Sequence, residues 1–123
     1  MKIVRLLSLG LVVAVLGCGK ESYGGTGPSG TPGANEVWMQ NIAFNPSPRA
    51  VTLGTTITWT NKDGFAHTVT SSSVPGGVAA ISSGNIAGSG TFQVTFSTVG
   101  TYQYFCTIHG TAASGMRGTI TVN

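Results

Sequence analysis

The feature that most limits the possible folds of this chain is a series of short alternating runs between residues 36 and 123. Runs in which apolar and polar side chains alternate recur there, separated by turns rich in Gly, Pro and Asn. The clearest is 91–96, where Phe92, Val94 and Phe96 share one face. A period of two is typical of half-buried strands, and no convincing helical repeat is present. We therefore expect an all-β sandwich of about seven strands.

The expected strands cover residues 37–44, 50–53, 55–60, 65–72, 91–96, 101–106 and 117–122. The first run is predicted as one continuous strand. Residues 73–90 are rich in Gly and Ser, and only a short element at 78–81 is predicted there. Tyr102 lies four residues before a cysteine and is expected to form a tyrosine corner, which is a packing device.

The first residues of the chain have the features of an export signal. Lys2 and Arg5 precede an apolar stretch of eleven residues, which is too short to span a bilayer as a helix. The stretch ends in Val15-Leu16-Gly17-Cys18 and resembles a bacterial lipobox. That resemblance implies a signal peptide over 1–17 and a diacylglyceryl group on Cys18. The alternative is an ordinary signal peptide that is cut nearby.

Residues 18–35 are predicted to be a flexible linker. Between Ser22 and Gly33, eleven of the twelve residues are Gly, Ser, Thr or Pro. Such a composition buries too little apolar surface to offset the entropy lost on ordering. We therefore expect a folded domain over 36–123, lipid-anchored on the periplasmic side of a bacterial envelope. The Gly19-Lys20 pair does not resemble an inner-membrane retention signal, which favours the outer membrane.

The charge balance argues against nucleic acid as a partner. The formal net charge is +3, but Lys2 and Arg5 belong to the export signal. Four cations and three carboxylates remain after them, which leaves a net charge of about +1. No basic run or basic-aromatic cluster is present, and such a cluster is the usual mark of nucleic-acid binding.

A cysteine and a histidine three positions apart suggest a metal site. Cys106 is the only cysteine after Cys18, and His67 and His109 are the only histidines of the chain. Met116 follows His109 by seven positions. Two imidazoles, one thiolate and a weak thioether are the ligands of a mononuclear blue-copper site. Taken singly, each residue has an ordinary structural role, such as a buried apolar cysteine. Structural zinc requires four strong ligands, and only three exist here.

Three motifs resemble the plastocyanin/pseudoazurin branch of the cupredoxins. They are Phe65-Ala66-His67-Thr68-Val69-Thr70, then residues 100–109 ending in Cys106-Thr107-Ile108-His109, and then Gly115-Met116-Arg117-Gly118 at the start of the last strand. The resemblance covers nearly all of 36–123. It implies a Greek-key β-sandwich of seven to eight strands that binds one type 1 copper ion (Cu²⁺/Cu⁺). The implied ligands are His67, Cys106, His109 and, axially, Met116.

One departure from the plastocyanin pattern affects the axial position. Six residues separate His109 from Met116, where the plastocyanin pattern has four. The carbonyl oxygen of Ala66 and the thioether of Met39 are therefore kept as alternative axial ligands. Asn61 and Asp63 precede His67 and are expected to hydrogen-bond across the loops. By resemblance Asn61 is the residue that ties the ligand loops together, and the alternative is that both serve only the turn.

The resemblance implies a one-electron carrier and not an enzyme. A multicopper enzyme needs additional histidines, and the type 1 site would use both that exist. One rival is an envelope copper-binding or delivery protein without a redox role. Met39 and Met116 are the only methionines after the export signal, which favours retention of copper over its transfer. A second rival is an immunoglobulin-like adhesion module that binds no metal.

The expected partners are an unidentified redox donor and acceptor that dock near His109. Gly110, Ala112, Ala113 and either Pro46 or Pro75 are expected to form an apolar rim around this histidine. We expect a monomer that contacts the membrane only through its lipid anchor. With a mature charge near neutrality, association with partners is expected to depend weakly on salt.

Overall fold

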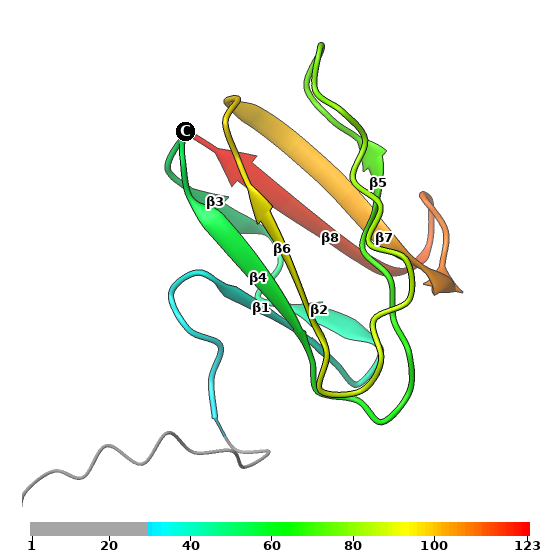
Figure 1. The fold of residues 1–123 in the computed structure, drawn as a ribbon. Coiled ribbons are helices and arrows are strands. Elements are labelled where there is room, and N and C mark those ends of the chain that lie inside the picture. The colour runs from blue at the N-terminus through cyan, green and yellow to red at the C-terminus, as the bar shows by residue number, and fades with distance from the viewer. Residues whose placement is uncertain (1–29) are drawn as a thin grey trace, which may run out of the picture.

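The computed structural model describes residues 30–123, which form eight strands in two four-stranded sheets (Figure 1). The strands are β1 (Glu36–Gln40), β2 (Ala43–Asn45), β3 (Arg49–Val51), β4 (Thr56–Asn61), β5 (Thr70–Ser73), β6 (Thr91–Thr95), β7 (Gly100–Gly110) and β8 (Gly115–Val122). This part of the chain contains no helix, so none of it could cross a membrane in helical form. The all-β fold of seven to eight strands is confirmed. The predicted signal peptide, Cys18 and most of the predicted linker lie outside the described residues.

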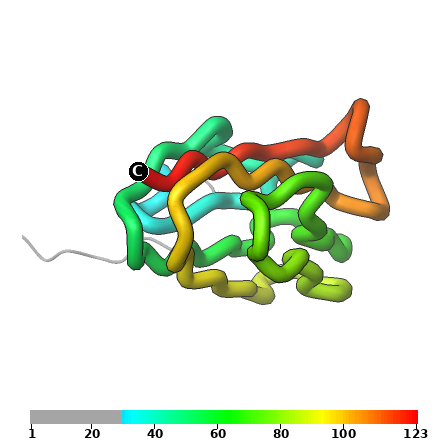
Figure 2. Tube along the Cα trace, turned by 90° about the horizontal axis from the view of Figure 1, so that it is seen from above, coloured from blue at the N-terminus to red at the C-terminus, as the bar shows by residue number. Residues whose placement is uncertain are grey.

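The chain passes repeatedly between the two sheets. One sheet has the order β2-β1-β4-β6 and the other β3-β8-β7-β5. The pairs β1–β4 and β3–β8 are parallel, and the remaining pairs are antiparallel. β7 and β8 run side by side and project beyond the rest of the domain at the hairpin between them (Figure 2). That hairpin lies at the opposite end of the sandwich from the C-terminus (Figure 1).

The prediction of a single strand over 37–44 is wrong. β1 ends at Gln40, and β2 returns antiparallel to it from Ala43. Asn41 and Ile42 form the turn between them, with φ angles of 55° and 58°. Asn tolerates this left-handed backbone, but a β-branched residue rarely adopts it, so the apolar Ile42 concealed the turn.

β1 also lacks the alternation expected of a half-buried strand. Val37, Trp38 and Met39 are all buried in succession. β1 lies between β2 and β4, and the Trp38 ring is covered by Gly30 and by the Lys62 ammonium, 4.5 Å from the ring centre. Cover on both faces removes the polar side that the alternation would need.

Aromatic side chains fill the core between the sheets. Trp59 packs edge-to-face on Tyr104, with ring centres 5.4 Å apart, and Phe44 contacts the same tyrosine at 4.7 Å. The Tyr102 hydroxyl donates a hydrogen bond to the Thr98 carbonyl at 2.8 Å, so the predicted tyrosine corner is confirmed. Tyr102 and Tyr104 therefore lie on the face of β7 that packs in the core, and the buried Cys106 lies on the same face.

The segment between His67 and β6 differs most from expectation. The strand predicted over 65–72 is reduced to β5, and residues 65–69 instead lie beside the Gly/Ser-rich segment. His67 and Ile86 exchange backbone hydrogen bonds of 3.1 and 2.8 Å, and an isolated bridge joins Thr70 to Ser82. Ile86 is buried. The sequence predicts little structure for the segment 73–90, but this segment packs beside His67 through Ile86.

Candidate metal centre

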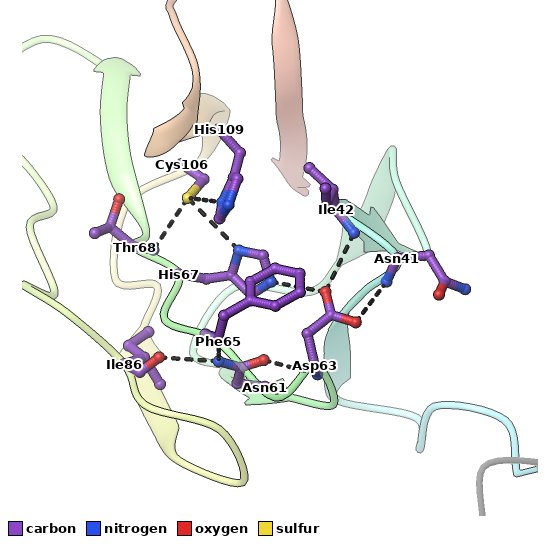
Figure 3. Close-up of polar contacts among 10 residues, drawn as sticks. All are labelled: Asn41, Ile42, Asn61, Asp63, Phe65, His67, Thr68, Ile86, Cys106 and His109. Carbon is purple, nitrogen blue, oxygen red and sulfur yellow. Dashed lines mark hydrogen bonds and ion pairs between the residues drawn. The ribbon is translucent and has the colours of Figure 1, made fainter.

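Three side chains with metal-binding atoms converge at one end of the sandwich. One ligand atom from each of His67, Cys106 and His109 can be chosen so that all three lie within 4.8 Å of one another. The Cys106 Sγ is 3.7 Å from the His67 Nδ1 and 3.5 Å from the His109 Nδ1 (Figure 3). His67 precedes β5, whereas Cys106 and His109 lie on β7. The structure therefore brings together the three residues that the sequence singled out.

The spacing of these atoms fits a metal ion. Bonds of about 2.0 Å to an imidazole nitrogen and about 2.3 Å to a thiolate sulfur are usual in protein metal sites. Such bonds at angles between tetrahedral and trigonal place N and S about 3.5–3.7 Å apart. The two distances in the protein, 3.7 and 3.5 Å, agree with this value. The arrangement of donors therefore fits one ion between the three side chains.

A bulge in β7 creates the space for this cluster. Phe105 pairs with Arg117 and Gly110 pairs with Gly115, with a shift of register between the two pairs. Residues 106–109 of β7 thus lie opposite a single residue of β8, Met116. Met116 is buried, with 2% of its surface exposed. The bulge turns Cys106 and His109 out of the regular ladder and places Met116 across from both.

The longer loop forms a tight hairpin at the tip of β7 and β8. The Thr111 amide donates to the Ser114 carbonyl at 2.8 Å, and the Thr111 hydroxyl accepts from the amides of Ala113 and Ser114. Gly115 has a φ of 82°, and a Cβ there would lie 2.6 Å from the His109 carbonyl oxygen. The loop has two residues more than the plastocyanin pattern, and the hairpin past the Gly110–Gly115 pair accommodates them. Met116 therefore still lies opposite the bulge.

Thr68 connects the two segments that supply the ligands. Its amide donates to the Cys106 Sγ at 3.3 Å, and its hydroxyl accepts from the Thr107 amide at 2.8 Å. The hydroxyls of Thr68 and Thr107 are 3.0 Å apart. The Thr68 amide thus holds the Cys106 sulfur from the segment that carries His67. Sequence reasoning missed Thr68, because only its position directly after His67 pointed to it.

His67 is held in place by a contact of its Nε2 atom with Asp63. The His67 imidazole is fully buried, and its Nε2 is 2.8 Å from the Asp63 Oδ2. Partial burial alone would raise the pKa of Asp63, but hydrogen bonds from the Asn41 and Ile42 amides and the interaction with His67 outweigh it, so this pKa is lowered. The expectation that Asp63 hydrogen-bonds across the loops is confirmed, because it reaches the β1–β2 turn as well as His67.

Asn61 hydrogen-bonds across the loops as expected, but it does not connect the two ligand segments as the resemblance implied. Its side-chain amide donates to the carbonyls of Phe65 and Ile86, at 2.8 and 2.9 Å, and its oxygen accepts from the Asp63 amide. These bonds close the turn before His67 and tie it to the 73–90 segment. The link between the ligand segments themselves comes from Thr68 and Thr107.

The sequence comparisons agree with this geometry. The family of copper-binding proteins described as the plastocyanin/azurin family matches residues 33–123. The chain belongs to this family. It is 38% identical over 88 residues to plastocyanin of Scenedesmus fuscus, covering 66% of this chain and 87% of that protein. It is 31% identical over 77 residues to amicyanin-alpha of Methylorubrum extorquens, covering 63% and 65%.

Comparison with solved structures also relates this chain to the cupredoxins. The structure of a reduced amicyanin mutant superimposes with a TM-score of 0.64 at 30% sequence identity, covering 74% of this chain and 83% of that one. A second amicyanin mutant, in its Cu(I) form, gives a TM-score of 0.63 at 28% identity. Both the cupredoxin resemblance and the β-sandwich are thereby confirmed. With the His-Cys-His cluster at its end, this cupredoxin has copper as its cofactor.

The Phe65 ring packs against both histidines of the cupredoxin site. The Phe65 ring centre lies 5.2 Å from that of His67 and 5.3 Å from that of His109. Phe65, Ile42 and Ile108 are each nearly half exposed, and His109 is partly exposed. Of the two prolines named as alternatives for the rim around His109, Pro75 is excluded, because it packs against Gly100 at the other end of β7.

Proposed function

We propose that this protein is a type 1 copper protein that acts as a one-electron carrier in the cell envelope. The observation behind the proposal is the cluster of one cysteine sulfur and two histidine Nδ1 atoms at 3.5 and 3.7 Å. A copper ion bound there would alternate between Cu²⁺ and Cu⁺ and so supply the one-electron chemistry. His67 and His109 are the only histidines of the chain, so none remains for a second copper centre, and we propose no enzymatic activity.

The proposed ligands are the Nδ1 atoms of His67 and His109, the Cys106 thiolate and the Met116 thioether. Support for Met116 comes from its place opposite the 106–109 bulge. Met39 is also fully buried, but it pairs with Asn61 and Phe44 in the other sheet. Met39 and the Ala66 carbonyl are the alternatives for the axial position. A long, weak axial bond is the usual fourth contact in such sites.

The hydrogen bonds around the ligands suit electron transfer. Thr68 holds Cys106, and Asp63 holds His67, through bonds made by the protein alone. Donor atoms that are held in place by the fold need little rearrangement when the charge of the bound ion changes. A preorganised site lowers the cost of each electron transfer in the same way that it lowers the cost of other charge changes.

The proposed docking surface for redox partners consists of His109, Phe65, Ile42 and Ile108. The three apolar residues are exposed, His109 is partly exposed, and the Phe65 ring lies 5.3 Å from the His109 ring. A small apolar surface suits the brief contacts typical of electron-transfer complexes. Because the mature charge is about +1, we propose weak dependence of association on salt. We propose that the protein acts as a monomer and binds no nucleic acid.

We propose that Cys18 is lipidated after removal of residues 1–17, and that residues 18–35 tether the domain to a bacterial membrane. The lipobox-like Val15-Leu16-Gly17-Cys18 and the Gly/Ser/Pro-rich linker support this location. We favour the periplasmic face of the outer membrane. In bacterial expression, the wild-type protein is expected in the membrane fraction and a Cys18→Ala variant is expected to lose lipid labelling. Lipid-free wild-type protein would contradict the proposed anchor.

One experiment separates a carrier from a copper-delivery protein. Copper-loaded protein is mixed with a Cu⁺ chelator while its electron self-exchange is followed separately by NMR line broadening. A carrier is expected to exchange electrons much faster than it loses copper. The opposite order of rates would favour delivery, and absence of copper uptake would favour a metal-free adhesion module.

A further inference from the structure

Asp63 occupies an unusual position among the charged groups of the domain. Glu36 and Asp63 are the only carboxylate side chains in residues 30–123. Asp63 lies beside the metal cluster, with its Oδ2 2.8 Å from the His67 Nε2 (Figure 3). Its side chain is 10% exposed and that of His67 is fully buried. A single negative charge therefore lies against the buried face of a proposed copper ligand.

The protein holds this carboxylate from a second direction. The Asn41 amide donates to Oδ1 at 2.9 Å, and the Ile42 amide donates to Oδ2 at 3.2 Å. Both donors belong to the β1–β2 turn, where each residue has a positive φ. Such a backbone at Ile42 persists only where surrounding contacts compensate for it. Asp63 thus stabilises the turn, and the two amides hold its carboxylate beside His67.

This arrangement sets the tautomer of His67. A carboxylate only accepts hydrogen bonds, so the Nε2 that faces Asp63 must carry the hydrogen. The Nδ1 lone pair is then free, and it faces the Cys106 Sγ at 3.7 Å. Carboxylates that accept from a metal-binding histidine orient the ring and raise its basicity. Without Asp63, the Nε2 of this fully buried ring would have no hydrogen-bond acceptor among the contacts of the described residues.

We propose that Asp63 is a positioning residue that fixes the Nε2–H tautomer of His67 and biases bound copper toward Cu²⁺. The proposal rests on the proposed copper function. A negative charge held close to a ligand in a poorly hydrated site stabilises the doubly charged ion more than the singly charged one. The carboxylate therefore strengthens Cu²⁺ binding relative to Cu⁺ binding and lowers the reduction potential.

The chain offers a matched control for charge. Glu36 lies at the opposite end of β1 from the turn that Asp63 braces, about 17 Å away for a five-residue strand. Glu36→Gln removes the same charge as Asp63→Asn while leaving the site untouched. A general effect of net charge would act in both variants, whereas an effect through His67 would act only in Asp63→Asn.

The first test uses the metal-free protein. Two-bond ¹H–¹⁵N NMR at mildly alkaline pH reports the tautomer of each histidine. His67 is expected as the Nε2–H tautomer in the wild type and in Glu36→Gln, with a mixture of tautomers in Asp63→Ala. An Nδ1–H tautomer in the wild type, or an unchanged tautomer in Asp63→Ala, would overturn the proposal without involving copper.

The second test compares the copper-loaded wild type, Asp63→Asn and Glu36→Gln by voltammetry. Asp63→Asn is expected to raise the affinity for Cu⁺ relative to Cu²⁺ about tenfold, which corresponds to an upward shift of 59 mV for a one-electron couple. Glu36→Gln is expected to keep the wild-type potential. The proposal would be overturned if all three proteins had equal potentials and metal-free Asp63→Asn had a lower stability. Asp63 would then only stabilise the β1–β2 turn. A wild type with no reversible couple contradicts the proposed function instead, while the NMR result still decides on the tautomer.

Discussion

Thr68 and Thr107 join the two ligand-bearing segments across 39 residues of sequence. The Thr107 amide donates to the Thr68 hydroxyl at 2.8 Å, and the two hydroxyls are 3.0 Å apart. Directly beside this contact, the Thr68 amide donates to the Cys106 sulfur. The geometry of the metal cluster therefore depends on a polar contact made by residues that are not themselves ligands.

Thr68→Val should destabilise the metal-free protein. The substitution keeps the shape of the side chain but leaves the partly buried Thr107 amide without its acceptor, which costs about 1–2 kcal/mol. Urea unfolding gives the free energy of unfolding. Thr107→Val is the control, because it removes only the contact between hydroxyls. Equal stability of the two variants would show that the amide contact contributes nothing.

Met116→Leu should keep the visible colour of the copper protein and raise its reduction potential. The three strong ligands remain, while loss of a weak axial donor favours Cu⁺, which tolerates low coordination better. Leu replaces Met at nearly constant volume in the buried site, so the fold should persist. Met39→Leu is the matched control in the other sheet. A shift in Met39→Leu but not in Met116→Leu would reassign the axial ligand.

Gly118→Ala should lower stability through a steric clash in the core. A Cβ at this position would lie 2.3 Å from the Cζ of Tyr104, the residue paired with Gly118 in the β7–β8 ladder. Overpacking of this kind costs about 1–3 kcal/mol. Thermal unfolding compares it with Gly76→Ala, where nothing lies within 4 Å of the added Cβ. An equal unfolding temperature for the two variants would contradict the close packing of Tyr104 on Gly118.

Glu36 should make part of the stability dependent on pH. Partial burial raises the pKa of its carboxyl, but hydrogen bonds from Thr60 and Gly33 and the charge of Lys62 outweigh burial, so the pKa is lowered. A lowered pKa means that this stabilisation is present above the ordinary value of 4.5 and is lost as the pH falls through the pKa of the folded state.

The measurement is the difference in free energy of unfolding between the wild type and Glu36→Gln, followed from neutral to acidic pH. The difference should favour the wild type at neutral pH, by less than about 1 kcal/mol because solvent screens the group. It should vanish in acid. A difference that stays constant with pH would show that the Glu36 charge contributes no stability.

The sequence predicts the ligand-bearing strand well, because β7 obeys a local rule. Tyr102, Tyr104 and Cys106 occupy every second position of the strand, and all three are buried as expected. The pairing of Cys106 with His109 in one short loop is likewise local. His67 can be predicted as a further ligand from its residue type alone, because His109 is the only other histidine of the chain.

The parts that sequence reasoning missed depend on contacts between distant residues. The turn at Asn41 and Ile42 is concealed because its backbone is compensated by Asp63, more than 20 residues away. The structure of 73–90 depends on hydrogen bonds to His67 and Ser71, which no local pattern encodes. Thr68 is one of many threonines in the chain, and only its contacts distinguish it.

The most direct test of a copper ion bound by Cys106 is the visible absorption spectrum of the Cu²⁺-loaded protein. A thiolate held 3.5 and 3.7 Å from two imidazole nitrogens should give an intense thiolate-to-copper band, and Cys106→Ser should abolish that band. A Cu²⁺ complex of the wild type without an intense visible band, or a band that persists in Cys106→Ser, would contradict the proposed centre.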